Sequence, residues 1–171
     1  MSKSLEDLQG EGLDQEAFVA QHSSPALLIA LPDEESGGGD VGMHTEILSS
    51  TMIKASLESA DKALLRTSRL EFLIKSDRNP FQNLIMVGRA RSNDVVLRHP
   101  GVSKVHATFS QVGGTWFIQD GKSRNGTYHN GEQLETGAKV ALEDGDGVGF
   151  GGKVVARFLL PASLWEFVSS L

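Results

Sequence analysis

From Arg69 onward the chain is a succession of short segments in which apolar and polar residues alternate, separated by turn residues. An alternation of period two places the apolar side chains on one face of a β-strand. In "VHATF", for example, Val105, Ala107 and Phe109 are expected to face a core. Glycine pairs and an Asn-Gly step between segments suit the tight turns of hairpins. The pattern predicts an all-β sandwich or barrel.

The regions on either side of this pattern differ from it. Near the N-terminus, Asp14 is placed to cap a short helix, and the apolar run "ALLIAL" is followed by the glycine-rich, acidic stretch "DEESGGGDVG". Further on, Leu57, Ala60 and Leu64 share one helical face, and Pro161 opens a tail with helical spacing of apolar residues. The sequence thus predicts four regions: an acidic, partly flexible segment at 1–43, a helical connection at 44–66, the sandwich at 67–160 and a C-terminal helix at 161–171.

Composition limits the location and the partners of the protein. The 171 residues contain no cysteine, which excludes disulfides, thiolate metal sites and a cysteine nucleophile. No segment reaches the roughly 18 to 20 consecutive apolar residues that span a bilayer, and the acidic N-terminus is unlike an export signal. We therefore expect a cytoplasmic protein without a membrane partner. A net charge of -6 also argues against nucleic acid, whose recognition needs many cations.

The positive charge of the chain is concentrated in one window. Residues 1–66 hold 12 acidic and 4 basic residues, whereas residues 67–171 hold 10 acidic and 12 basic ones. Six cations fall within 88–124, against only Asp94 and Asp120. Several of them stand where strands end, and the strand ends and loops of a sandwich meet at its edges. One edge could therefore bind an anion through arginine, lysine and serine donors. The alternative, which charge alone leaves open, is a set of solvated surface cations.

The stretch "GVSKVHATF" also raises the question of catalysis. A hydrolase would need Ser103 activated by His106 and oriented by Asp120 or Asp94. Nothing in the chain resembles a nucleophile elbow, and residues three apart in a strand point to opposite faces. We therefore expect no catalytic residue.

Metal and nucleotide sites are also disfavoured. His99 and His106 lack the spacing of known ligand sets. In "EDGDGVGFGG" a calcium loop would need oxygen ligands where valines stand, so a β-turn around Asp144 and Asp146 is the better interpretation. The same glycines lack the strand-to-helix unit of a nucleotide site. No metal and no cofactor is expected.

Four motifs resemble one known family. The stretches "GRARSNDVVL", "VSKVHATF", "DGKSRNGTYHNG" and "LEDGDGVGFG" occur in this order, and together they resemble the forkhead-associated (FHA) domain. The similarity covers roughly Arg69 to Leu160 and implies a phosphopeptide-binding, all-β sandwich of about eleven strands. The flanking stretches resemble those of the small stand-alone FHA proteins of bacteria.

The resemblance implies roles for individual residues. Arg89 and Ser103 would contact the phosphate of the ligand, with Lys104 and Arg124 as cations beside it. Asn125 would hold the backbone of the bound peptide. Family members usually prefer phosphothreonine, and some have threonine or serine where this chain has Arg124. The binding loops would be supported by Gly88, His106 and Gly126.

The function implied by the resemblance is that of a non-enzymatic adaptor. It would recognise phosphothreonine in a partner protein, such as a Ser/Thr kinase or a kinase substrate, or in its own N-terminal 66 residues. The alternative is a scaffold of the same fold that binds its partner without phosphate, through another face. The two hypotheses differ in whether binding depends on phosphorylation and on Arg89.

Overall fold

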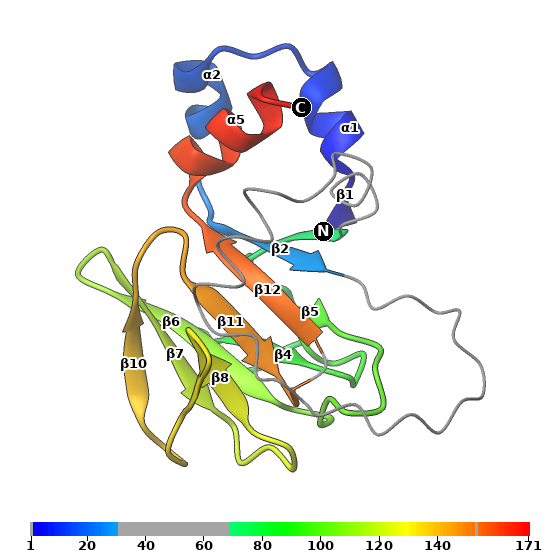
Figure 1. Ribbon diagram of the computed structural model, residues 1–171, viewed down its shortest axis with the longest axis vertical. Coiled ribbons are helices and arrows are strands. Elements are labelled where there is room, and N and C mark those ends of the chain that lie inside the picture. The colour runs from blue at the N-terminus through cyan, green and yellow to red at the C-terminus, as the bar shows by residue number, and fades with distance from the viewer. Residues whose placement is uncertain (1, 31–68, 153) are drawn as a thin grey trace.

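The computed structural model describes residues 2–30, 69–152 and 154–171, whose arrangement is shown in Figure 1. Within these residues, two β-sheets of seven and five strands form a sandwich, and the three described helices gather at one end of the molecule. The expected β-sandwich and C-terminal helix are confirmed, with twelve described strands where about eleven were expected.

The larger sheet combines strands from both ends of the chain. Its order is β1-β3-β2-β12-β11-β8-β9, and every neighbouring pair is antiparallel. Within it, Leu28 of β2 lies between Leu70 of β3 and Arg157 of β12. The strands are β1 (Ser2–Lys3), β2 (Ala26–Ala30), β3 (Arg69–Phe72), β8 (Thr127–His129), β9 (Glu132–Gln133), β11 (Gly147–Phe150) and β12 (Val154–Leu159).

The smaller sheet has the order β10-β7-β6-β4-β5. Its only parallel pair among the described strands is β4 and β5, which therefore end at the same edge. Strand β6 begins at that edge and β7 returns to it, because both pairings of β6 are antiparallel. The strands are β4 (Ile85–Gly88), β5 (Val95–Val96), β6 (Ala107–Val112), β7 (Thr115–Asp120) and β10 (Lys139–Leu142).

Apolar side chains from both sheets fill the space between them. Ala107 and Phe109 of β6 are fully buried, as the alternation predicted, and Phe150 and Phe158 of the larger sheet belong to the same cluster. Val105 is only half-buried, because β6 begins two residues later, so its expected place in the core is wrong.

Strand β2 buries side chains on both of its faces. Leu27 and Ile29 belong to the core between the sheets, whereas Ala26 and Leu28 pack in a second core beneath the helices. Burial on both faces explains why "ALLIA" is a continuous apolar run rather than an alternating one. The sequence-based division at residue 67 therefore separates β2 from the sandwich to which it belongs. The helices that cover the second core are α1 (Leu5–Gly10), α2 (Gln15–Gln21) and α5 (Pro161–Ser169).

Helix α2 begins at the cap that the sequence indicated, and α5 begins at the expected Pro161. The Ala17 amide donates to Asp14 Oδ1 at 2.9 Å, which caps α2. Helix α5 has no side-chain cap at its own N-cap residue, and the Leu160 amide donates instead to Asp144 Oδ1 at 2.7 Å. Asp144 lies in the expected β-turn, which the Asp146 amide closes by donating to the Glu143 carbonyl at 3.1 Å. This turn therefore holds the C-terminal helix against the sheet.

The remaining sequence expectations concern the region between β2 and β3. The helical connection at 44–66 and the glycine-rich stretch before it lie outside the described residues. Among the described helices, none combines the length and the apolar character needed to cross a membrane.

Candidate functional site

Three loops of the smaller sheet meet at the edge where β4 and β5 end. They are residues 89–93 after β4, residues 97–106 between β5 and β6, and residues 121–126 between β7 and β8. We call this the loop edge. Gly151, in the turn between β11 and β12, also reaches it, because its amide donates to the Gly126 carbonyl at 2.8 Å. From that turn β12 leads to α5, so the length of a six-residue strand, about 20 Å, separates the loop edge from the helices.

The first two loops are joined directly after β4. The Arg89 amide donates to the Ser103 carbonyl at 2.9 Å, and the Ala90 amide donates to the Lys104 carbonyl at 3.1 Å. Gly88 is required here for space, because a Cβ at this position would lie 2.9 Å from the Ser103 carbonyl oxygen and closer still to that of Lys104. The Arg89 side chain is exposed and donates through Nε to the Val102 carbonyl at 3.1 Å. Its guanidinium is therefore held beside residues 102–104.

Ser103 joins the second loop to the third. Its hydroxyl oxygen accepts a hydrogen bond from the Arg124 amide at 2.9 Å. This bond leaves the hydroxyl proton of Ser103 available for an acceptor outside the protein. The backbone of Ser103 contacts Arg89 and its side chain contacts Arg124, so the three residues lie at one point of the loop edge.

His106 is the buried support of this arrangement. The Ser103 amide donates to His106 Nδ1 at 3.0 Å, and Nε2 lies 2.8 Å from the Gly126 carbonyl. A backbone amide can only donate, so Nδ1 is the acceptor and Nε2 carries the proton. Burial of the ring lowers the pKa of His106, which keeps it neutral. The ring also meets Phe150 edge-on at a centroid distance of 5.7 Å.

Asn125 and Gly126 follow in the third loop. The exposed Asn125 side chain donates through Nδ2 to the Gly101 carbonyl at 3.0 Å, which ties the third loop to the second. Its Oδ1 has no hydrogen-bond partner among the described residues. Gly126 has a φ of 86°, a conformation that is strained for residues with a Cβ. Its carbonyl can therefore turn toward His106 and Gly151.

The side chains around the loop edge carry positive charge that no carboxylate of the described residues neutralises. Asp120 accepts hydrogen bonds from Thr127 Oγ1 at 2.7 Å and Ser123 Oγ at 2.5 Å, and these bonds outweigh burial and lower the pKa of Asp120. At the other end of β4, the Asp94 carboxylate accepts hydrogen bonds from Asn79 Nδ2 and from the Met86 amide, each at 2.7 Å. Six exposed cations of the window form no ion pair with any described residue: Arg89, Arg91, Arg98, Lys104, Lys122 and Arg124.

Among the residues expected from the sequence, Arg89, Ser103, Arg124 and Asn125 share the loop edge, linked by the bonds above. Lys104 lies in the same loops through its backbone, and its side chain is exposed. Gly88 packs against the carbonyls of Ser103 and Lys104. The buried ring of His106 joins the Ser103 amide to the Gly126 carbonyl. Sequence reasoning missed Asn93, which is fully buried between two of the loops. Nothing in its residue type distinguished Asn93 from the turn residues around it.

The alternative sites suggested by single residues take other roles. His106 Nδ1 is occupied by a backbone amide and the Ser103 hydroxyl is bonded to Arg124, so the pair does not form a nucleophile and base. His99 Nδ1 accepts from the Gly101 amide at 3.0 Å. The Oδ2 of Asp146, in the turn before β11, lies 2.7 Å from the Nε2 of His129 in β8. In the part of the chain that the structure describes, no group of three metal-ligating side chains occurs.

Comparison with known proteins shows that part of the chain is similar to one family. Residues 85–151 match the family model of the FHA domain. An FHA domain-containing protein of Arabidopsis thaliana is 38% identical over 68 residues, which are 39% of this chain and 18% of that protein. FhaB of Mycolicibacterium smegmatis is 34% identical over 58 residues, 34% of this chain and 37% of that protein. The chain thus spans well under half of the length of either relative.

Solved structures give similar matches. The solution structure of the FHA domain of a hypothetical protein from Arabidopsis thaliana is 33% identical, with a TM-score of 0.43, over 45% of this chain and 66% of that chain. EmbR of Mycobacterium tuberculosis, solved in complex with a low-affinity phosphopeptide, is 29% identical, with a TM-score of 0.42, over 46% of this chain and 20% of that chain.

Proposed function

We propose that the chain, whose residues 85–151 match the model of the forkhead-associated domain, is an adaptor that binds phosphothreonine in a partner protein. FHA domains are among the modules that read phosphorylated motifs through clusters of cations. The partner would be a Ser/Thr kinase or a kinase substrate, and the adaptor would act in the cytoplasm, downstream of kinase signalling. Binding, rather than catalysis, is the role proposed for the loop edge.

The observation that carries this proposal is the meeting of Arg89, Ser103 and Arg124 at one point. A phosphate group brings about -1.5 to -2 charges and three acceptor oxygens. The guanidinium of Arg89 offers a planar fork of donors, and the Ser103 hydroxyl adds a shorter one. Arg124 and Lys104 would add positive charge on either side of the phosphate.

Asn125 supports the peptide part of the proposal. Its Nδ2 has a second N–H besides the one directed at Gly101, and its Oδ1 is an acceptor without a described partner. A side chain that offers a donor and an acceptor on an exposed loop suits the backbone of an extended peptide. We propose that Asn125 holds that backbone beside the phosphothreonine.

Phosphate dependence is the direct test of the proposal. We expect the full chain to bind a degenerate peptide library with a fixed central phosphothreonine, and to bind the same library with unmodified threonine far more weakly. A phosphoserine library measures the expected preference for threonine. Titration by fluorescence anisotropy gives all three affinities. Equal affinity for the modified and unmodified libraries would instead favour a scaffold that binds its partner without phosphate.

The pH dependence of binding gives a second prediction. The second pKa of a phosphate monoester is about 6, so the ligand loses charge as the pH falls from 7.5 to 5.5 and binding should weaken. Burial lowers the pKa of His106 from its ordinary value and its Nδ1 accepts a hydrogen bond from the Ser103 amide, so both effects oppose protonation of this ring on acidification. Affinity that rises on acidification would show that protonation of the protein contributes, and would contradict this account.

A further inference from the structure

Asn93 is a buried residue that joins two loops of the proposed phosphate site. Its side chain is fully buried, with 0% of its surface exposed. Nδ2 donates to the Ala90 carbonyl at 2.8 Å, within its own loop, and to the Lys104 carbonyl at 2.6 Å, in the loop of Ser103. The Ala90 amide also donates to the Lys104 carbonyl, at 3.1 Å. The side-chain amide of Asn93 therefore sets the distance between the segment that follows Arg89 and the segment that contains Ser103.

The orientation of this amide is determined by its surroundings. Rotating it by half a turn would place Oδ1 against the carbonyls of Ala90 and Lys104, which are both acceptors. In the observed orientation Oδ1 is buried without a hydrogen-bond partner among the described residues. An unpaired buried acceptor is unfavourable for stability. Asn93 therefore carries a local cost, which is the kind of exception found at functional sites.

We propose that Asn93 is a positioning residue of the phosphate site. By bonding both carbonyls, it sets the distance between the Arg89 loop and the Ser103 loop, and so holds the guanidinium and the hydroxyl where one phosphate meets both. Asn93 acts through these loops and does not touch the ligand, since its side chain is fully buried. The effect on binding rests on the proposed phosphopeptide function, whereas the effect on loop geometry does not.

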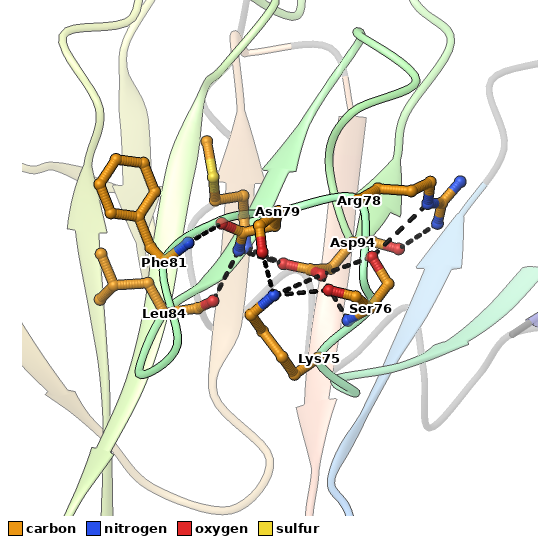
Figure 2. A network of polar contacts seen from close by, with 8 residues as sticks. Lys75, Ser76, Arg78, Asn79, Phe81, Leu84 and Asp94 are labelled. Atoms are coloured by element: carbon orange, nitrogen blue, oxygen red, sulfur yellow. Dashed lines mark hydrogen bonds and ion pairs between the residues drawn. The ribbon is translucent and has the colours of Figure 1, made fainter.

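Asn79 provides a matched control in the same fold. It is also buried, with 3% exposed, and its Nδ2 also donates twice, to the Leu84 carbonyl and to Asp94 Oδ2, each at 2.7 Å. Figure 2 shows this network, in which Asp94 also accepts from the Met86 amide at 2.7 Å. The network lies at the start of β4, at the opposite end of that strand from Arg89. Loss of Asn79 therefore removes two donated bonds away from the phosphate site, together with the bond that its Oδ1 accepts from the Phe81 amide at 2.8 Å.

The test compares Asn93→Ala with Asn79→Ala in the full chain, below the melting temperature of each variant. Affinity for the phosphothreonine library should fall at least about tenfold for Asn93→Ala and less than about twofold for Asn79→Ala. Amide hydrogen exchange without ligand provides a second readout. It should quicken at Ala90 in the first variant and at Met86 in the second, because these amides bond to the disturbed groups. Asn93→Leu keeps the side-chain size if the alanine variant does not fold.

The outcomes separate the proposals. A tenfold loss confined to the Asn93 variants supports the positioning role. Equal losses for the Asn93 and Asn79 variants, or no loss for either, would overturn it, because a purely structural role predicts no difference between them. If the wild type binds no phosphothreonine, the proposed function fails by itself. Exchange at Ala90 that is unchanged in Asn93→Ala would then overturn the inference about loop geometry, and faster exchange there would support it.

Discussion

Replacing Gly88 by alanine is expected to lower the stability of the fold by about 3 kcal/mol, at the upper end of the range for overpacked positions. The new methyl group would lie 2.9 Å from the Ser103 carbonyl oxygen and nearer still to that of Lys104. Both carbonyl groups accept hydrogen bonds from the backbone amides of Arg89 and Ala90, so neither can move aside at low cost. The end of β4 and the Ser103 loop must therefore separate.

The same change should also remove phosphopeptide binding, because Arg89 follows Gly88 directly and its amide bonds to Ser103. Gly10→Ala is the control: a Cβ on Gly10 in α1 meets nothing within 4 Å, and alanine favours a helix by roughly 1 kcal/mol. Urea unfolding gives the two stabilities, and titration with the phosphothreonine library gives the two affinities. A Gly88→Ala protein as stable as wild type would show that the loops separate freely, contrary to the packing described.

The sequence was sufficient to predict the sandwich and the order of its motifs, because alternation and turn residues are local signals. It was not sufficient to assign β2. Leu27 and Ile29 face one core while Leu28 faces another, so the strand shows no alternation, and its partners β3 and β12 are far away in the chain. A short apolar run of this kind is ambiguous between a strand and a helix by periodicity alone.

The candidate site shows the same limit. Arg89 and Ser103 could be selected from the sequence because charge and motif spacing point to them. Asn93 could not, because its importance depends on two carbonyl groups that only the fold brings to its amide. The role expected for His106 from the family resemblance agrees with its bonds, and its protonation state follows only from knowing that the Ser103 amide donates to it. Residues that act through backbone groups leave little trace in sequence.

Arg89→Ala is expected to weaken binding of the phosphothreonine library by at least about 2 kcal/mol, or roughly thirtyfold. The variant loses both the charge and the fork of donors, whereas the described part of the fold loses only the bond from Nε to the Val102 carbonyl. Stability should therefore change little. Arg89→Lys restores the charge without the fork, so its affinity should lie between those of the alanine variant and the wild type.

A matched arginine separates the site from the general charge of the protein. Arg78 is exposed, donates to the Asp94 carbonyl at 3.3 Å, and lies with the network at the start of β4, away from the loop edge. Arg78→Ala removes the same charge as Arg89→Ala and should leave affinity within about twofold of wild type, since exposed charges beyond about 10 Å are screened in ordinary buffer. Equal losses for the two variants would mean that the protein attracts phosphopeptides only by its overall field, and the assignment of the phosphate to Arg89 and Ser103 would be wrong.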